Sequence, residues 1–311
     1  MEKTVVPVIL GPTAVGKTSF VLRVAEAFGY EVVSCDSRQV YRYMDIGTAK
    51  PSPSERERVK HWMIDILEPD EPYSAFAFAG GALRIIREAR ESGKKILICG
   101  GTGLYYYVTL EGADRLDEAD AGLRLRLQEE AREQGAARMH GRLAAVDPEA
   151  ASKIHPNNLQ RILRALDIFY RKGVPLSVLQ KEGRQLEDID FRAVVVSRPR
   201  DVLYGRINRR VDAMMEAGLW EEFMRLRAMG YGERAPGMVC VGYRELFGVE
   251  RGEVGLDRAV ELIKQNTRHY AKRQMTWFRN KTRCESVDVA DESGDFLMDW
   301  FAQRITANTN K

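Results

Sequence analysis

Apolar residues occur in short runs in the N-terminal third of the chain, and amphipathic stretches separate these runs. Residues 4–10 (TVVPVIL), 31–35 (EVVSC) and 95–99 (KILIC) are apolar runs that include β-branched side chains. Residues 17–28 and 74–92 place apolar side chains at helical spacing. Apolar strands that alternate with helices predict an α/β fold with a parallel sheet covered by helices on both faces.

The pattern changes near residue 114. The following stretch is helical and charge-rich, without a convincing strand, until residues 193–196 (AVVV) resume the strand type. The sequence therefore predicts an α/β core formed by residues 1–113 and 192–311, interrupted by a helical insertion over residues 114–191.

A phosphate-binding motif follows the first strand. Residues 11–18 (GPTAVGKT) fit G-x-x-x-x-G-K-[ST], with a strand before the motif and a helix after it. In such a loop the backbone N–H groups and the helix N-terminus attract phosphate, Lys17 adds a positive charge, and Thr18 is placed to hold Mg²⁺. The candidate diphosphate or nucleotide-binding residues are Gly11, Pro12, Thr13, Ala14, Val15, Gly16, Lys17 and Thr18. The structural alternative is a glycine-rich turn that matches the motif by chance.

An acidic residue ends the second strand. Asp36 directly follows residues 31–35, and ligands of open α/β sheets gather at the carboxyl ends of the strands. Asp36 is therefore expected to face the same crevice as the phosphate loop. Its position fits a Mg²⁺ ligand, a general base or the N-cap of the next segment, and spacing alone leaves all three open.

Charge becomes informative near the C-terminus. The 311 residues carry 48 Lys and Arg against 45 Asp and Glu, and this net charge of +3 does not itself indicate a nucleic-acid-binding protein. Residues 264–284, however, contain basic but no acidic side chains, interleaved with Tyr270, Trp277 and Phe278. Such a segment favours a surface that binds phosphates and stacks on bases, against an ordinary solvated helix face with aromatic core anchors. The basic residues are Lys264, Arg268, Lys272, Arg273, Arg279, Lys281 and Arg283.

Other features exclude several classes of protein. No run of about 18 apolar residues exists, so no membrane-spanning helix and no membrane partner are expected. The four cysteines, Cys35, Cys99, Cys240 and Cys284, form neither a CxxC pair nor a metal-binding spacing. They are expected to be free thiols in the reducing cytoplasm.

Several motifs together resemble the tRNA dimethylallyltransferases, also called tRNA isopentenyltransferases. They follow the family's order over nearly the whole chain, and the second and the last are the most specific. The motifs are GPTAVGKT (11–18), DSRQVYRYMDIGTAKP (36–51), GGTGLY (100–105), HPNNLQRILRAL (155–166) and TRHYAKRQMTWFR (267–279). One departure is Val15, where serine is common in the family.

The resemblance implies a fold like that of P-loop NTPases and a defined reaction. A dimethylallyl group would pass from dimethylallyl diphosphate to N6 of adenosine 37, in the anticodon loop of tRNA, and diphosphate would leave. Asp36 would be the general base, Thr13 would position the reacting groups, and Arg210 would place a second cation on the diphosphate, although a solvated helix-face arginine is its alternative. Mg²⁺ held by Thr18 would help to neutralise the leaving group.

The resemblance also implies residues that contact tRNA. Asp36 and the three residues after it, Ser37, Arg38 and Gln39, would meet the extruded adenine or its neighbours. Thr102 matches a family position that meets tRNA, with a helix N-cap as its alternative. Further implied contacts lie in the insertion, which would grip the anticodon stem-loop, in a turn near residue 242 and in the basic segment. They are Arg124, Gln160, Arg161, Arg164, Gly242, Arg244, Arg273, Gln274, Trp277 and Arg279. For Arg124 the alternative is a solvated helix residue.

Other functions fit part of the sequence. A small-molecule P-loop kinase would share the phosphate loop and the core, but it leaves the basic segment and the motif after Asp36 unexplained. A transferase that prenylates free adenine nucleotides would share the chemistry, whereas the long insertion and the basic segment favour an RNA acceptor. A non-catalytic RNA-binding NTPase is the remaining alternative. The expected partners are tRNA and dimethylallyl diphosphate, and the protein is expected to be a monomer.

Overall fold

The computed structural model describes residues 3–111, 120–181, 186, 188–282, 284–289 and 295–306. Within these residues six parallel strands form one sheet, in the order β3-β2-β4-β1-β5-β6. The strands are β1 (Thr4–Leu10), β2 (Tyr30–Cys35), β3 (His61–Trp62), β4 (Lys95–Gly100), β5 (Ile189–Ser197) and β6 (Glu285–Asp288). Because all of them run in the same direction, the loops that follow them meet at one edge of the sheet.

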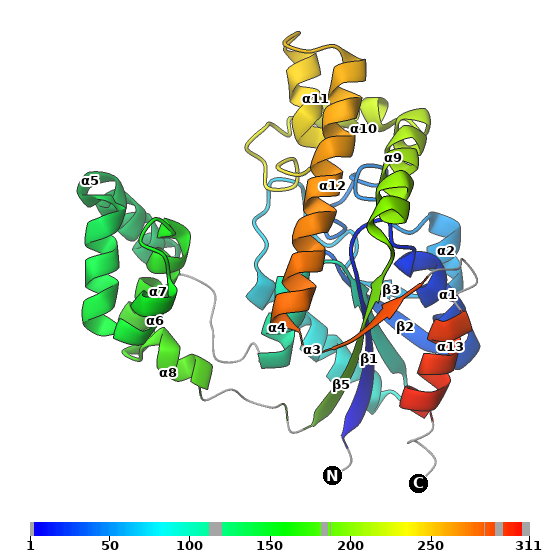
Figure 1. Ribbon diagram of the computed structural model, residues 1–311, viewed down its shortest axis with the longest axis horizontal. Helices are drawn as coiled ribbons and strands as arrows, with labels where there is room; N and C mark the ends of the chain where they lie inside the picture. The colour runs from blue at the N-terminus through cyan, green and yellow to red at the C-terminus, as the bar shows by residue number, and fades with distance from the viewer. Residues whose placement is uncertain are drawn as a thin grey trace. The chain divides into compact units, whose positions relative to one another are not determined.

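Helices cover both faces of this sheet. Figure 1 shows α3 and α4 on one side of it, and α1 and α13 on the other. The helices of this unit are α1 (Lys17–Phe28), α2 (Pro53–Arg58), α3 (Ala75–Glu91), α4 (Gly103–Glu111), α9 (Arg200–Glu216), α10 (Leu219–Ala228), α11 (Tyr243–Glu250), α12 (Leu256–Lys281) and α13 (Asp295–Phe301), followed by the π-helical turn η2 (Ala302–Thr306). No helix in the described ranges is long and apolar enough to cross a membrane.

Two apolar clusters stabilise this unit. One joins the sheet to α1, α9 and α13, and it includes Val24, Leu97 and Phe301. The other joins α9, α10, α11 and α12 to the segment after β2, and Phe223 and Tyr243 are fully buried in it. Burying one large apolar side chain stabilises a fold by about 1.5–3 kcal/mol, so each cluster holds its elements firmly together. Side chains from both clusters line the pocket described below.

The chain divides into two compact units, one formed by Met1–Leu110 with Asp188–Lys311 and the other by Glu111–Glu187. The second unit is helical and has its own apolar core. Its helices are α5 (Ala121–Val146), α6 (Pro148–Lys153), α7 (Leu159–Lys172) and α8 (Leu176–Lys181). Buried Asp147 accepts hydrogen bonds from the N–H groups of Ala150 (2.9 Å) and Ser177 (2.8 Å), which ties α6 to α8.

The predicted α/β class with a parallel sheet is confirmed, but some bounds differ from those predicted. Residues 188–191, assigned to the insertion from the sequence, lie in the sheet-containing unit, because β5 already begins at Ile189 and pairs with β1 from Thr4 onward. This end of β5 mixes polar and apolar residues, so it lacks the apolar pattern of a buried strand. The predicted boundary between residues 113 and 114 lies outside the described residues.

Candidate active site

Three loops at the carboxyl edge of the sheet open into a pocket of about 980 Å³. They follow β1, β2 and β4, and side chains from α9 and α12 complete the wall. Lys17, Asp36 and Arg210 all line this pocket, although they come from distant parts of the sequence. The topology of the sheet therefore brings the phosphate loop and the acid after β2 into one cavity.

The phosphate loop (residues 11–18) has the shape of an anion cradle. Ala14 and Gly16 have positive φ angles of 62° and 105°, which curl the chain into the start of α1. In the described part of the chain no side chain caps α1, so its first N–H groups stay available to an anion. Val15 is fully buried in the apolar cluster of the sheet, which explains why an apolar side chain is accommodated at this position.

Lys17 contributes a cation whose charge is sensitive to its surroundings. Its Nζ donates hydrogen bonds to the carbonyl groups of Gly11 and Pro12, each at 2.8 Å. Burial lowers the pKa of Lys17 to about 8, while the nearby Cys99 and Asp36 act in the opposite direction. Lys17 is therefore mostly charged at neutral pH, and a bound anion would raise its pKa further.

Two arginines support the phosphate loop from β5 and α9. Arg198 Nε donates to the carbonyl of Val15 (2.9 Å), and Arg206 Nε donates to the carbonyl of Ala14 (3.0 Å). The C=O and N–H groups of a trans peptide point in opposite directions, so these contacts also orient the N–H groups that follow. Neither arginine was among the predicted site residues. Arg198 lies just past the carboxyl end of a strand and Arg206 one helical turn before Arg210, so position alone could have indicated both.

Arg210 reaches the same loop from α9. Its NH1 group donates to Thr13 Oγ1 at 3.4 Å. Burial lowers the pKa of Arg210, and the charge of Asp36 raises it. Arg210 thus contacts Thr13 and lines the pocket. It is not a solvated residue on the outer face of the helix, which was the alternative.

Asp36 has one engaged and one available carboxylate oxygen. Its Oδ1 accepts hydrogen bonds from the N–H groups of Arg38 (2.8 Å) and Gln39 (3.4 Å). Among the described residues, nothing donates a hydrogen bond to Oδ2. A capping role and a chemical role for Asp36 are therefore compatible. The hydrogen bonds to Oδ1 fix the carboxylate and leave Oδ2 for a ligand in the pocket.

Thr102 connects the loops after β2 and β4. Its hydroxyl oxygen accepts a hydrogen bond from the N–H of Ser37 (3.0 Å), and its own N–H donates to the carbonyl of Cys35 (3.2 Å). The hydroxyl therefore holds the residue next to Asp36.

The two residues after Ser37 are also bound within the protein. Arg38 NH1 donates to the carbonyl of Pro236 at 2.8 Å. The amide of Gln39 accepts from Ser34 Oγ (2.8 Å) and donates to the carbonyl of Ala49 (3.1 Å). Both residues line the pocket, and in this structure their polar groups shape its wall.

A buried acid fixes the loop that contains DIGTAKP. Glu222 in α10 is 1% exposed. Its two oxygens accept hydrogen bonds from the N–H groups of Asp45 (2.9 Å), Ile46 (2.8 Å) and Gly47 (3.0 Å), and from the hydroxyl of Tyr243 (2.5 Å). Since Gly47 lines the pocket, Glu222 sets the position of this wall from behind.

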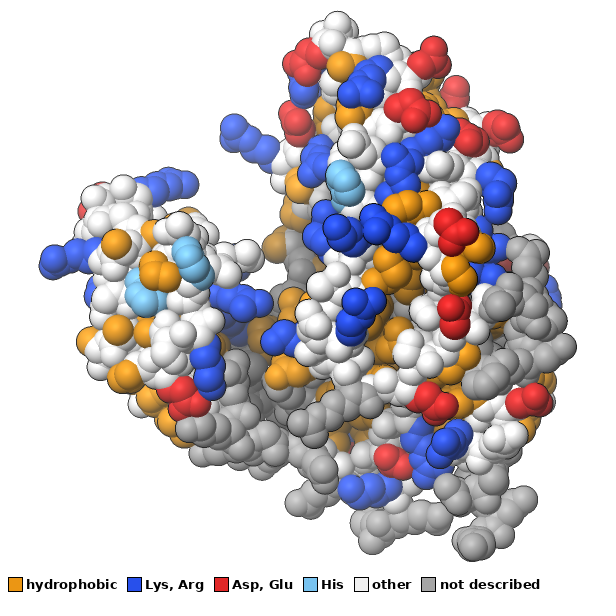
Figure 2. Space-filling model, viewed as in Figure 1, with side chains coloured by type: hydrophobic (Ala, Val, Ile, Leu, Met, Phe, Trp, Pro, Cys, Tyr) orange, Lys and Arg blue, Asp and Glu red, His pale blue; other side chains and the backbone are white. Residues whose placement is uncertain are grey.

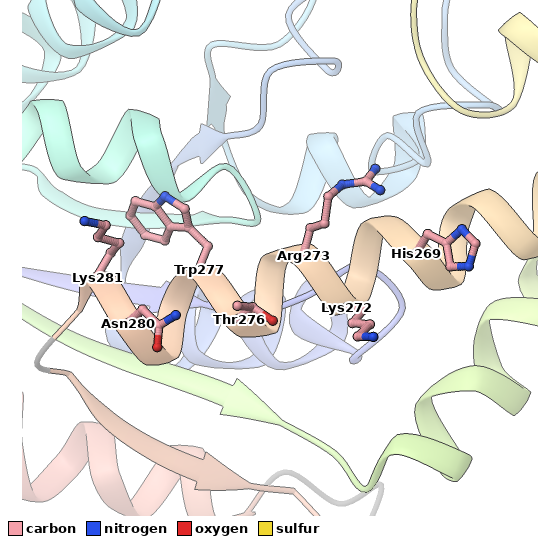
Figure 3. A pocket seen from close by; sticks show the side chains of 7 residues that line it. All are labelled: His269, Lys272, Arg273, Thr276, Trp277, Asn280 and Lys281. Atoms are coloured by element: carbon pink, nitrogen blue, oxygen red, sulfur yellow. The ribbon is translucent and has the colours of Figure 1, made fainter. Parts of the chain in front are cut away.

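A basic groove of about 510 Å³ lies along α12. Figure 2 shows Lys and Arg side chains gathered over the middle of this helix. Figure 3 shows Arg273 and Trp277 extending from the same side of α12. One part of the Trp277 ring packs on Gly103, where a Cβ atom would come within 2.2 Å of it. Trp277 is therefore both a packing anchor and part of the groove, whose lining is His269, Lys272, Arg273, Thr276, Trp277, Asn280 and Lys281.

The other predicted contacts of this unit have different surroundings. Gly242 has a φ of 107° at the start of α11, and with Arg244 it lines the pocket. Arg279 is exposed on α12. Gln274 is buried and makes contacts of a different kind, which are described below. Arg283 of the basic segment lies outside the described residues.

The predicted contacts of the insertion all lie in the helical unit. Arg124 on α5 and both Gln160 and Arg161 on α7 are exposed. Arg164 is partly buried, and its NH1 group forms an ion pair with buried Asp167 at 2.8 Å. Arg164 therefore helps to hold α7 in place, whereas the other three present polar groups to solvent.

The chemistry of the pocket favours a metal held jointly with a ligand. In the described portion of the chain, no three His, Cys, Asp or Glu side chains come together as a metal site. Thr18 and Asp36 nevertheless both line the pocket and offer oxygen donors. Mg²⁺ commonly binds through one or two protein oxygens together with phosphate oxygens and water. The donor set thus fits a magnesium ion that arrives with a diphosphate.

The cysteines at the pocket are not activated. Burial raises the pKa of Cys99 to about 11 and that of Cys240 to about 12. Both are therefore neutral thiols near pH 7, and a neutral thiol is a poor nucleophile. The pocket is better suited to direct transfer between two bound substrates than to a covalent cysteine intermediate.

Comparisons with known proteins agree on one family. The sequence pattern described as IPP transferase matches residues 39–281, and a pattern described as isopentenyl transferase matches residues 4–67. The chain is 48% identical to the tRNA dimethylallyltransferase of Syntrophobacter fumaroxidans over 93% of this chain and 85% of that protein.

Solved structures give the same result. A tRNA Δ(2)-isopentenylpyrophosphate transferase from Staphylococcus epidermidis is 37% identical, with a TM-score of 0.71, and the match covers 98% of this chain and all of that one. A eukaryotic dimethylallyltransferase acting on tRNA is 26% identical, with a TM-score of 0.81 over 99% of this chain and 78% of that one.

Proposed function

This chain belongs to the IPP transferase family, and we propose that it transfers a dimethylallyl group from dimethylallyl diphosphate to N6 of adenosine 37 in tRNA. Prenyl transfer to tRNA is the activity of the family. The observation that carries the proposal is one pocket lined both by the cationic phosphate cradle and by Asp36, whose Oδ2 accepts no hydrogen bond from the described residues.

The cradle is suited to a diphosphate leaving group. The N–H groups at the start of α1, together with Lys17 and Arg210, surround the space in which the diphosphate would lie. They would stabilise the negative charge that develops on the departing oxygen as the allylic C–O bond breaks. The contacts of Arg198 and Arg206 with loop carbonyls would keep the cradle in this form before the substrate arrives.

Asp36 is suited to take a proton from the acceptor. As the adenine N6 attacks the allylic carbon, a C–N bond forms, and the electrons of the C–O bond leave with the diphosphate. N6 must then lose one proton, and Asp36 Oδ2 would accept it within the same pocket. Thr13, held by Arg210, would align the diphosphate with the amine.

A divalent metal would share the cradle. Thr18 would hold Mg²⁺ together with the diphosphate oxygens, which leaves Asp36 Oδ2 to act as the base. When bound, the ion would supply further charge neutralisation to the leaving group. Removal of divalent cations with EDTA is expected to abolish transfer, and added Mg²⁺ is expected to restore it.

Two surfaces would bind the RNA. The groove on α12 combines Lys272, Arg273 and Lys281 with the accessible part of Trp277, as expected for phosphate contacts and base stacking. In the helical unit, the exposed Arg124, Gln160 and Arg161 would contact the anticodon stem-loop. Adenosine 37 would leave its stack to enter the pocket. All these residues belong to one chain, so we propose that a monomer is active.

The decisive experiment is a transfer assay with the purified protein. Unmodified tRNA and dimethylallyl diphosphate are incubated with Mg²⁺, and the digested nucleosides are analysed by mass spectrometry. Prenylated adenosine is expected, and it should disappear when adenosine 37 is replaced by guanosine. Absence of product from the unmodified tRNA would refute the proposal.

Control reactions separate the alternatives. Adenosine monophosphate as acceptor tests nucleotide prenylation, and ATP with small acceptors tests kinase activity; neither is expected to give product. Asp36→Asn keeps the size of the side chain but removes its basicity. This variant is expected to bind tRNA normally and to transfer at least about 100-fold more slowly. Full activity of the variant would exclude Asp36 as the base.

A further inference from the structure

Gln274 on α12 joins two loops of the active site. The residue is 8% exposed. Its Oε1 accepts a hydrogen bond from the N–H of Thr13, and its Nε2 donates to the carbonyl of Gly101, both at 2.9 Å. Since a backbone N–H only donates and a carbonyl only accepts, these partners allow one orientation of the amide. Both polar atoms of the Gln274 amide thus bind partners inside the protein, whereas its neighbour Arg273 lines the groove.

One of the two loops held by Gln274 is the phosphate cradle, and the other contacts the loop that carries Asp36. Thr13 belongs to the phosphate loop and faces Arg210. Gly101 precedes Thr102, whose hydroxyl accepts the hydrogen bond from Ser37, next to Asp36. A continuous chain of hydrogen bonds and short backbone links therefore runs from α12 to the phosphate cradle on one side and to the proposed base on the other.

The space around this junction is tight. A Cβ atom on Gly101 would lie 2.5 Å from Gln274 Nε2 and 3.3 Å from the carbonyl oxygen of Gly11. The amide therefore has little room to adopt another position. Glutamate at this site would have no donor for the Gly101 carbonyl, and methionine would replace neither hydrogen bond.

We propose that Gln274 is a positioning residue that couples α12, the helix with the RNA-binding groove, to the geometry of Thr13 and Asp36. This inference rests on the proposed function. It assigns Gln274 a role within the protein in place of the tRNA contact expected from the sequence. RNA that binds on α12 would thereby act on the helix that aligns the diphosphate with the acceptor amine.

The test compares Gln274→Glu and Gln274→Met with the wild-type protein. The rate of a single turnover at saturating tRNA and dimethylallyl diphosphate is expected to fall by about 10- to 100-fold in both variants, because small misplacements of reacting groups have effects of this size. The Kd for unmodified tRNA is expected to stay within about twofold of the wild-type value. The matched control is Gln265→Met, which changes an exposed glutamine of the same helix and is expected to alter neither quantity. Arg273→Gln is expected to raise the Kd for tRNA.

A double variant tests the hydrogen-bond chain itself. If Gln274 acts on Asp36 through Gly101 and Thr102, the rate loss of Gln274→Met combined with Thr102→Val is expected to be smaller than the product of the two single losses. Multiplicative losses would contradict coupling through Thr102. Cooperative urea unfolding, followed by tryptophan fluorescence, reports whether each variant is folded.

Other outcomes would overturn the proposal. A weaker tRNA affinity with an unchanged single-turnover rate would mean that Gln274 contacts RNA, and variants that match the wild type in both quantities would mean that it has no such role. If a Gln274 variant does not fold, as shown by the absence of a cooperative urea-unfolding transition, and the other variant retains the wild-type rate, the proposal also fails. A wild-type protein that transfers no prenyl group would refute the proposed function, a result that is separate from these.

Discussion

Glu222 provides the sharpest test of how the pocket wall is held. Its carboxylate accepts three backbone hydrogen bonds from Asp45, Ile46 and Gly47 and a fourth from the hydroxyl of Tyr243. Glu222→Ala removes every acceptor at once. An unsatisfied buried donor costs about 1–3 kcal/mol, so the three N–H groups alone predict a loss of at least about 3 kcal/mol in the free energy of unfolding.

Glu222→Gln separates the hydrogen bonds from the volume of the side chain. The amide oxygen would still accept from two N–H groups, but its NH2 group would face another donor, the N–H of Gly47. A smaller loss of roughly 2 kcal/mol is therefore expected. Because Gly47 lines the pocket, the KM for dimethylallyl diphosphate or for tRNA is also expected to rise in both variants.

Urea unfolding followed by tryptophan fluorescence measures the effect directly. Trp220 stacks on Phe223 in the same cluster, with ring centroids 5.5 Å apart, so its emission reports on the environment of Glu222. The matched control is Glu221→Gln, which changes an exposed neighbour and is expected to leave stability unchanged. If Glu222→Ala lost less than about 1 kcal/mol, the reasoning from unsatisfied donors would be refuted.

Three further predictions follow from the charges and the packing. Lys17 attracts phosphate only when it is protonated, and burial lowers its pKa to about 8. Affinity for inorganic diphosphate, measured by calorimetry, is therefore expected to fall about tenfold between about pH 7 and 9, and a constant affinity would contradict this. Gly103→Ala forces the Trp277 ring to move, so a stability loss of about 1–3 kcal/mol is expected in the same urea assay, and unchanged stability would show that the ring yields freely. Affinity for tRNA in filter binding is expected to fall about 10- to 100-fold between about 50 and 200 mM salt if roughly four phosphates are contacted, whereas a flat response would exclude the basic groove as an RNA site.

The parts of the fold with strong local patterns could be predicted from the sequence. β1 and α1 follow from one apolar run and one amphipathic stretch, and both have the predicted bounds. β3 and β6 were not predicted, because two and four residues form no periodic pattern. These strands exist through pairing with β2 and β5, a tertiary effect that no local pattern contains.

In the candidate site, too, local motifs could be predicted from the sequence, whereas long-range contacts could not. The phosphate loop is recognisable because its residues are consecutive, and Asp36 is recognisable because it directly follows an apolar strand. The contacts of Glu222 and Gln274 inside the protein are not recognisable from the sequence. The backbone partners of Glu222 lie 175 to 177 residues away, and those of Gln274 lie 173 and 261 residues away. A buried acid in an amphipathic helix has the sequence pattern of a solvated one, and only the folded chain shows that its oxygens meet backbone N–H groups.

The hydrogen bond between Thr13 and Gln274 also has a consequence for protein synthesis. The two residues are 261 positions apart, so the ribosome completes the phosphate loop long before the residue that fastens it is made. A nascent chain that ends before α12 already holds the first five strands, yet it lacks the amide that secures Thr13. If Gln274 positions the reacting groups as proposed, catalytic competence is expected only near the end of translation. Early termination within α12 would then yield a polypeptide with most of the sheet but without an active site in its final form.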